Sequence, residues 1–379
     1  MSIIIFIIIL MVLVIAHEAG HFFTAKAFKI KVEEFGFGFP PRLFGWKKGE
    51  TTYSVNALPF GGFVKIFGES LSEADCLEIG FLDKEDQEKK EAERKRNFSF
   101  KPKWQQALVL FAGITANFLL AWILLSVGFM SGLPTSTGSE VKGYELKDVR
   151  LVIVSVLKES PAELSGLKSG DKIVSIKTEK KSVDEITPDN LKSFILSNSE
   201  EEIEFGYIRG SNQDINFAKI IPEAGFSDGQ PGIGIAMDQI GTAKLPVFRA
   251  FVEGMKLNVS VTKDTTVGLY RLIVDGIQGK GSFASVTGPV GMVGIVGDAS
   301  KFGFVYLLSF AALISINLAI INFIPFPALD GGRLLFLLIE KIKGSRINPK
   351  FANTANMIGF AILILLMILI TYKDVVKLF

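Results

Sequence analysis

The stretch VIAHEAGHFFTA (residues 14–25) places two histidines and a glutamate in an N-terminal run that has no other charged residue before Lys26. On a helix, His17 and His21 lie one turn apart on the same face, so both imidazoles can bind one Zn²⁺ while Glu18 lies beside them to activate water. A charged or metal-binding group is costly at membrane depth, which makes it a candidate for function. The motif therefore predicts one catalytic zinc ion, Zn²⁺, inside a membrane helix.

The alternative for this motif is a pair of hydrogen-bonded histidines on a buried helix face. The chain has only two histidines, and both lie in the motif. Two histidines placed at random rarely stand four residues apart with a glutamate after the first. The spacing thus favours the zinc site.

The composition agrees with a membrane enzyme. The chain has 379 residues, of which 49% are hydrophobic, and its mean hydropathy is +0.38, which is too apolar for a typical soluble protein of this size. The net charge of +2 gives no reason to expect a nucleic-acid partner. A single cysteine, Cys76, excludes internal disulfides and cannot build a zinc site alone.

Four long apolar segments predict a polytopic α-helical membrane protein. Each is long enough to cross a bilayer core of about 30 Å as a helix. A cleaved signal peptide is the alternative for the first segment, but the basic residues that open such a peptide are missing before Lys26. The expected transmembrane helices are residues 1–27, 104–131, 302–340 and 352–372.

Residues 28–103 combine a β-like half with a highly charged half. Short apolar runs separated by glycines and prolines predict a membrane-associated β-hairpin region, and the charged part predicts a cytoplasmic loop. The segment Phe35–Phe39 follows the metal-binding helix closely and could pair with an extended peptide. An ordinary hairpin packed on the helices is an equal alternative. The candidate substrate-binding residues in this segment are Gly36, Phe37 and Gly38.

Residues 140–225 have an ordinary soluble composition and alternate between strand-like and helix-like runs, so we expect one inserted α+β domain. Residues 244–284 show a helical apolar spacing interrupted by charges. A helix lying in the membrane interface fits this pattern. Packing against the soluble domain is nearly as good an alternative.

A third zinc ligand is needed, because a catalytic zinc has three protein ligands and one position open for water. Asp330 is the only acidic residue between Asp298 and Glu340, and it lies where prolines and glycines interrupt the third apolar segment. Broken backbone persists at membrane depth only where protein or a cavity surrounds it. We therefore expect Asp330 to be the third ligand, with a capping or turn role as the alternative.

Two further features concern the membrane helices. Asn117 is a polar residue inside the second span, and an interhelical hydrogen bond is its favoured role over catalysis. Basic residues are frequent in residues 26–65 and again in residues 341–350, which predicts that both flanks of the site face the cytoplasm. The domain at 140–225 should then lie outside, and the active site near the cytoplasmic side.

Three motifs together resemble the site-2 protease family of zinc intramembrane proteases, in its bacterial regulator of sigma-E protease branch. They are HEAGH at 17–21, SPAELSGLKSGD at 160–171 and NFIPFPALDG at 322–331. The similarity covers nearly the whole chain, including GGFVK at 61–65 and KPKW at 101–104. The order of the motifs is far more specific than HExxH alone.

The resemblance implies roles for individual residues and for the partners. It implies that His17, His21 and Asp330 bind zinc, that Glu18 is the general base, and that Asn322 handles substrate near the metal. It also implies a PDZ-like domain at 140–225, and single-span membrane proteins as substrates, such as anti-sigma factors or signal-peptide remnants, cut beforehand by another protease. The implied location is the bacterial inner membrane, with the lipid bilayer around the helices.

The chain departs from the family in two places. It has room for one PDZ-like domain where this branch has two, which puts its partners in doubt. It has Gly113-Ile114 where the family often has Gly-Pro before the asparagine of the second span.

Two other classes of protein are alternatives. A non-proteolytic membrane adaptor would bind peptides through the PDZ-like domain and hold zinc structurally, but structural zinc normally has four protein ligands and the sequence offers three. A metal transporter would need more intramembrane His, Asp or Glu than this chain has.

Overall fold

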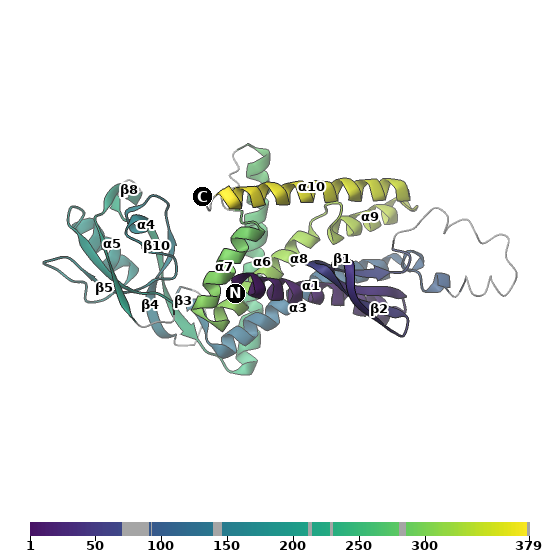
Figure 1. Ribbon diagram of the computed structural model, residues 1–379, viewed down its shortest axis with the longest axis horizontal. Helices are drawn as coiled ribbons and strands as arrows, with labels where there is room; N and C mark the ends of the chain where they lie inside the picture. Colours follow the sequence, from purple (N-terminus) through teal and green to yellow (C-terminus); the bar gives the residue numbers. More distant parts are fainter. Residues whose placement is uncertain are drawn as a thin grey trace. The chain divides into compact units, whose positions relative to one another are not determined.

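Four helices in the described part of the chain are long and apolar enough to cross a membrane, as the sequence predicts. They are α1 (Ser2–Ala27), α3 (Lys103–Ser131), α8 (Phe304–Phe323) and α10 (Pro349–Val376). The structure is a computed structural model, and it describes residues 1–69, 91, 93–138, 146–210, 214–227, 230–279 and 286–376 (Figure 1). Cys76 and most of the charged loop lie outside the described residues.

The chain divides into two compact units. The first contains Met1–Leu125, Gly254–Gly297 and Phe310–Phe379, and the second contains Ser126–Glu253 and Asp298–Ser309. The spans belong mainly to the first unit, and a β domain makes up most of the second.

Small residues let the spans of the first unit approach closely. A Cβ atom on Gly20 of α1 would overlap the carbonyl oxygen of Ala112 in α3 and would lie 2.9 Å from the Cβ of Ala116. Small side chains at helix contacts are the usual route to tight packing in membranes, where tail lipids are as apolar as leucine. A second contact that includes small residues joins α3 to α8, where Ala121 and Ala312 belong to one buried cluster.

Two further helices, which lie mostly in the first unit, follow the β domain in sequence. In α6 (Val247–Ile277), Leu257 and Val261 pack against the cluster of α3 and α8. Within this unit α6 is steeply inclined to α1 and α10 (Figure 1), and its position in the membrane interface stays a prediction. The helix α7 (Pro289–Phe302) was not predicted, because glycines dilute its periodicity.

The β region after α1 is a single long hairpin rather than several short strands. It consists of β1 (Val32–Lys48) and β2 (Thr51–Ile66). Its register folds back on itself, so that Phe35 is opposite Val64 on one side and Tyr53 on the other. Gly49 lies at the turn between the strands, whereas the other glycines that suggested chain breaks lie inside the strands, where irregular register accommodates them.

The third apolar segment, 302–340, is broken as expected. After α8 the chain runs irregularly through residues 324–329 before α9 (Asp330–Lys343) begins. A Cβ atom on Gly331 would overlap the carbonyl oxygens of Phe323 and Ile324, so only glycine lets the new helix start this close to the end of the old one.

The β domain is larger than the 140–225 that the composition predicted. Its six-stranded sheet has the order β3-β10-β4-β5-β6-β7. A separate two-stranded sheet is formed by β8 and β9. The domain extends to residues 133–243 because β10 lies between β3 and β4 in the sheet. The strands are β3 (Leu133–Ser136), β4 (Lys147–Val156), β5 (Lys172–Lys177), β6 (Ile203–Ile208), β7 (Ile215–Ile220), β8 (Glu223–Ser227), β9 (Gln230–Gly232) and β10 (Ile235–Ala243).

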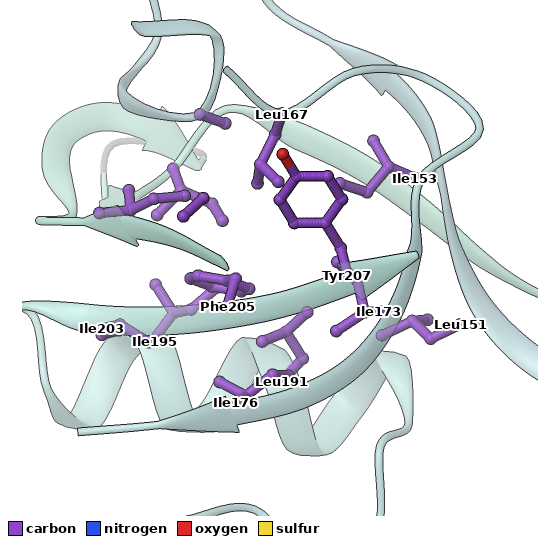
Figure 2. Packing of buried hydrophobic residues seen from close by; sticks show 14 residues of the cluster. Leu151, Ile153, Leu167, Ile173, Ile176, Leu191, Ile195, Ile203, Phe205 and Tyr207 are labelled. Atoms are coloured by element: carbon purple, nitrogen blue, oxygen red, sulfur yellow. The ribbon is translucent and has the colours of Figure 1, made fainter. Parts of the chain in front are cut away.

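Two helices complete this domain, α4 (Pro161–Leu164) and α5 (Pro188–Ser197). Leu191 of α5 packs with Phe205 and Tyr207 of β6 and with apolar side chains of β4 and β5 (Figure 2). Inside this unit, Asp171 is fully buried and binds the Arg209 guanidinium through both carboxylate oxygens at 2.7 Å, which raises the pKa of Arg209. The paired charges fix the turn that begins β5.

Candidate metal centre

The structure brings His17, His21 and Asp330 together. The Nε2 atoms of the two histidines lie 3.2 Å apart, and Asp330 Oδ2 lies 3.1 Å from His17 Nε2 and 3.3 Å from His21 Nε2. The two imidazoles come from adjacent turns of α1, and the carboxylate comes from the first residue of α9. Residues more than 300 positions apart in the sequence thus present three ligand atoms within 4.8 Å of one another.

This arrangement fits a bound cation. Three atoms that carry lone pairs face one another, and Asp330 Oδ2 is buried without accepting a hydrogen bond of ordinary geometry. A buried carboxylate oxygen without a partner is costly unless an ion or proton satisfies it. Two imidazoles and one carboxylate are a donor set of catalytic zinc sites. Among the described residues, no fourth His, Cys, Asp or Glu joins this group.

Glu18 stands next to the ligand group but is not part of it. The hairpin passes beside it, because a Cβ atom on Gly62 of β2 would lie 3.2 Å from Glu18 Cγ and 2.8 Å from Val14 Cγ1. Glycine at 62 therefore keeps space around the Glu18 side chain. A carboxylate at this position, beside the ligand group and β2, could act as a general base towards a group bound there.

One stripe of α3 supports both histidines. The carbonyl oxygen of Val109 lies 2.8 Å from His21 Nδ1, and the amide of Asn117 lies 3.3 Å from His17 Nδ1. Between them, a Cβ atom on Gly113 would overlap His21 Nε2 and lie 2.9 Å from His17 Cε1. Positions 109, 113 and 117 follow one another at intervals of four residues, so they share one helix face.

The sequence did not predict that the Asn117 side chain contacts His17, a candidate metal ligand. An interhelical hydrogen bond was expected for Asn117, and the contact is interhelical, but its partner is His17. The spacing of Gly113 and Asn117, equal to that of the two histidines, was a signal that could have indicated facing stripes on two packed helices.

The loop that carries Asp330 is held by α10. Asn356 Oδ1 accepts a hydrogen bond of 3.2 Å from the backbone N–H of Ala328, which has a left-handed conformation with φ of 77°. Such a conformation is unfavourable for alanine and persists only when neighbours enforce it. Gly359 of α10 provides the space, because its Cβ atom would overlap the carbonyl oxygen of Pro327.

Among the described residues, the other predicted site residues form no hydrogen bond or ion pair with the ligand group. Asn322 is half-buried near the end of α8, and its side chain has no hydrogen-bond partner among the described residues, so its role in substrate handling stays a prediction.

Gly36 and Phe37 pair with β2 on both sides, and Asn56 Nδ2 donates to the Gly38 carbonyl at 2.9 Å. The free edge expected at Phe35–Phe39 is therefore not available over Phe35–Phe37, because β2 already occupies both sides. In the described residues, the strand edge left unpaired beside Glu18 is that of Gly62–Ile66.

Charged groups fasten the polar end of α1. Glu50, at the turn of the hairpin, accepts from Lys26 Nζ and from Arg96 Nη2, both at 2.5 Å. The hydrogen bond from Lys26 is the main cause that lowers the pKa of Glu50.

Two further ion pairs lie near the start of α9. Arg333, one turn after Asp330, forms an ion pair with Glu69, and Lys103 pairs with Glu340. These two pairs line a pocket of about 390 Å³ between α3, α9 and α10.

Comparison with known proteins gives one family. The family model described as "Peptidase family M50" matches residues 5–366. The chain is 30% identical to the regulator of sigma-W protease RasP of Bacillus subtilis, over 100% of this chain and 99% of that protein. It is 31% identical to a putative zinc metalloprotease of Fusobacterium nucleatum over the full length of both chains. It is 29% identical to the zinc metalloprotease RasP of Geobacillus kaustophilus, over 100% of this chain and 98% of that protein.

Proposed function

The chain belongs to peptidase family M50, and we propose that this zinc metalloprotease hydrolyses peptide bonds in the transmembrane segments of single-span membrane proteins. One observation carries the proposal: His17, His21 and Asp330 present three buried or half-buried ligand atoms within 4.8 Å, and two of them lie on a helix apolar enough to cross a membrane. A centre at that depth reaches peptide bonds that are embedded in the bilayer.

The chemistry divides between the ion and Glu18. A zinc ion held by His17, His21 and Asp330 would supply a water of lowered pKa and a Lewis acid for the scissile carbonyl. Glu18 accepts the proton of the attacking water and returns it to the leaving amine. The half-buried position of Glu18, beside the strand at Gly62, gives it access to a substrate that lies along this strand.

A substrate helix has to be unwound before it can be cut, because its carbonyls are bonded to amides four residues later. The unpaired edge of Gly62–Ile66 offers replacement partners through strand pairing. This edge replaces Phe35–Phe39 as the proposed pairing site. Gly36, Phe37 and Gly38 then act indirectly, since they form the sheet that positions the edge strand.

The wider assignment rests on the family and on charge distribution. We propose that the β domain is PDZ-like and extracytoplasmic, that it restricts or binds the trimmed ends of substrates, and that the active site lies towards the cytoplasm of a bacterial inner membrane. Substrates are then membrane proteins cut beforehand by another protease, with anti-sigma factors as the first class to test. The name of the Bacillus subtilis relative, a regulator of sigma-W protease, supports this class.

The adaptor alternative has less support. A structural zinc site should offer four protein ligands, whereas the group found among the described residues has three. The three-residue group found in the described part of the chain matches the donor set of a catalytic site better than that of a structural one.

The first test measures zinc content and cleavage of a tagged single-span protein in detergent for three proteins: wild type, Glu18→Gln and Asp330→Ala. Near one zinc per chain in wild type and Glu18→Gln, reduced zinc in Asp330→Ala and cleavage only by wild type would support the proposal. Cleavage by Glu18→Gln would remove Glu18 as the base. Bound zinc without cleavage of any single-span protein would favour the adaptor.

A further inference from the structure

The two metal-binding histidines are supported by different chemical groups on α3. His21 Nδ1 faces the carbonyl oxygen of Val109 at 2.8 Å. A backbone carbonyl can only accept a hydrogen bond, so the proton of His21 must reside on Nδ1 and the lone pair of Nε2 is free for a metal. His17 Nδ1 faces the side-chain amide of Asn117 at 3.3 Å instead.

An amide can face an imidazole in two ways with opposite consequences. If the amide nitrogen donates to His17 Nδ1, the single proton of neutral His17 sits on Nε2, which then cannot bind a metal. If the amide oxygen accepts, the proton sits on Nδ1 and Nε2 is free. A half-turn of the amide exchanges the two atoms. Asn117 is fully buried and its Oδ1 atom has no hydrogen-bond partner, so the oxygen is available for this role.

We propose that Asn117 is a positioning residue for zinc: its Oδ1 accepts the hydrogen bond of His17 Nδ1–H and thereby fixes the tautomer in which Nε2 binds the ion. Metal-ligating histidines generally donate their second N–H to a carboxylate, a carbonyl or water, and such partners orient the ring and raise its basicity. The inference rests on zinc binding in the proposed function, and it does not depend on whether the bound centre cleaves peptides.

A purely structural role for Asn117 is the competing explanation, because this turn of α3 is also where other helices attach. Ser315 of α8 donates to the carbonyl oxygen of Asn117 at 2.8 Å, and Asn258 of α6 donates to that of Phe118 at 3.1 Å. These bonds hold the same turn without touching His17. Ser315→Ala is therefore a matched control that loosens α3 and leaves the Asn117 side chain in place.

The experiment compares wild type with Asn117→Ala, Asn117→Asp and Ser315→Ala as full-length proteins in detergent, using zinc affinity from competition with a chromophoric chelator. We expect Asn117→Ala to weaken zinc binding by ~10- to 100-fold, the usual cost of losing such a partner. Asn117→Asp should stay within a few-fold of wild type, because a carboxylate accepts from the same position. Ser315→Ala should also bind zinc like wild type. Equal losses in Asn117→Ala and Ser315→Ala, or a loss in folded Asn117→Asp, would overturn the proposal.

A second measurement reads the hydrogen bond directly. Because the chain has only two histidines, ¹⁵N-histidine labelling gives a spectrum of these two imidazoles alone. At saturating zinc, Asn117→Ala should shift or remove the Nδ1–H signal of one histidine and leave the other, held by Val109, unchanged. Two unchanged signals would contradict the assignment. Zinc binding that follows the expected pattern without substrate cleavage would refute the protease and leave this inference standing.

Discussion

The two sides of the metal centre are built by opposite means. On the side of α1, two candidate ligands, His17 and His21, lie on consecutive turns of an uninterrupted helix, and their spacing alone brings them together. On the side of α9, one candidate ligand, Asp330, begins a new helix after an irregular segment, and α10 holds that segment through Asn356 and Gly359. The first side depends on local geometry, whereas the second depends on tertiary contacts. A substitution should therefore act on zinc through packing on the first side and through loop position on the second.

Among substitutions that test this comparison, the largest effect should come from filling the space behind the histidines. Gly113→Ala places a Cβ atom against both imidazoles, and overpacking of this kind costs about 1–3 kcal/mol. We expect zinc affinity to fall ~10- to 100-fold in a chelator competition assay. Gly268→Ala in α6 is the matched control, since no atom lies within 4 Å of its Cβ position. Equal zinc affinity in the two variants would show that α1 does not depend on close packing with α3.

Gly359→Ala tests the other side. Its Cβ atom would overlap the carbonyl oxygen of Pro327 and lie 2.8 Å from its carbonyl carbon, so the loop before Asp330 has to move. Since an irregular segment yields more easily than two packed helices, we expect a smaller loss of zinc affinity than in Gly113→Ala, ~3- to 10-fold, and reduced turnover at saturating zinc. A loss larger than that of Gly113→Ala would reverse the comparison.

Asn356→Ala removes one hydrogen bond to the same loop. The bond to the Ala328 N–H is neutral and partly buried, so its net value is ~0.5–1.5 kcal/mol. We expect turnover to fall a few-fold, with the Asp330 side chain still able to bind zinc. Asn353→Ala is the control. Asn353 and Asn356 both line the pocket between α3, α9 and α10, but Asn353 has no hydrogen bond to the loop. If both variants lose turnover equally, the pocket and not the loop contact is responsible.

The smallest effect concerns the polar end of α1. The pKa of Glu50 is lowered in the folded protein, chiefly by Lys26, so the pair stabilises the protein above the ordinary pKa of glutamate and this contribution disappears as the pH falls through the lowered value. Glu50→Gln should reduce thermal stability at pH 7 by ~0.2–1 kcal/mol, the range for exposed ion pairs. Below the lowered pKa both proteins should melt alike, and a difference that persists there would exclude this ion pair as its cause.

The difference between the two sides also explains what could be predicted from the sequence. The spans follow from apolar length, and the approach of His17 to His21 follows from helical period. Asp330 could be singled out as an acid in an apolar segment, but its distance to the histidines depends on how α8, α9 and α10 pack. The unpaired strand edge could not be placed, because the alternation of residues does not reveal that β1 has β2 on both sides. The extent of the β domain was underestimated for the same reason, since β10 joins the sheet far from its neighbours in the chain.

The contacts by which Asn356 and Gly359 of α10 hold the loop before Asp330 have a consequence for biosynthesis. Both contacts that fix the position before Asp330 come from Asn356 and Gly359, which lie in α10, the last of the four candidate spans in the described part of the chain. While the chain is still being inserted into the membrane, α1 and α3 can already be paired, but the third ligand lacks its support. A ribosome-bound intermediate is therefore a protease without a formed centre. The order of synthesis therefore delays the formation of the centre until the first half of α10 has been made.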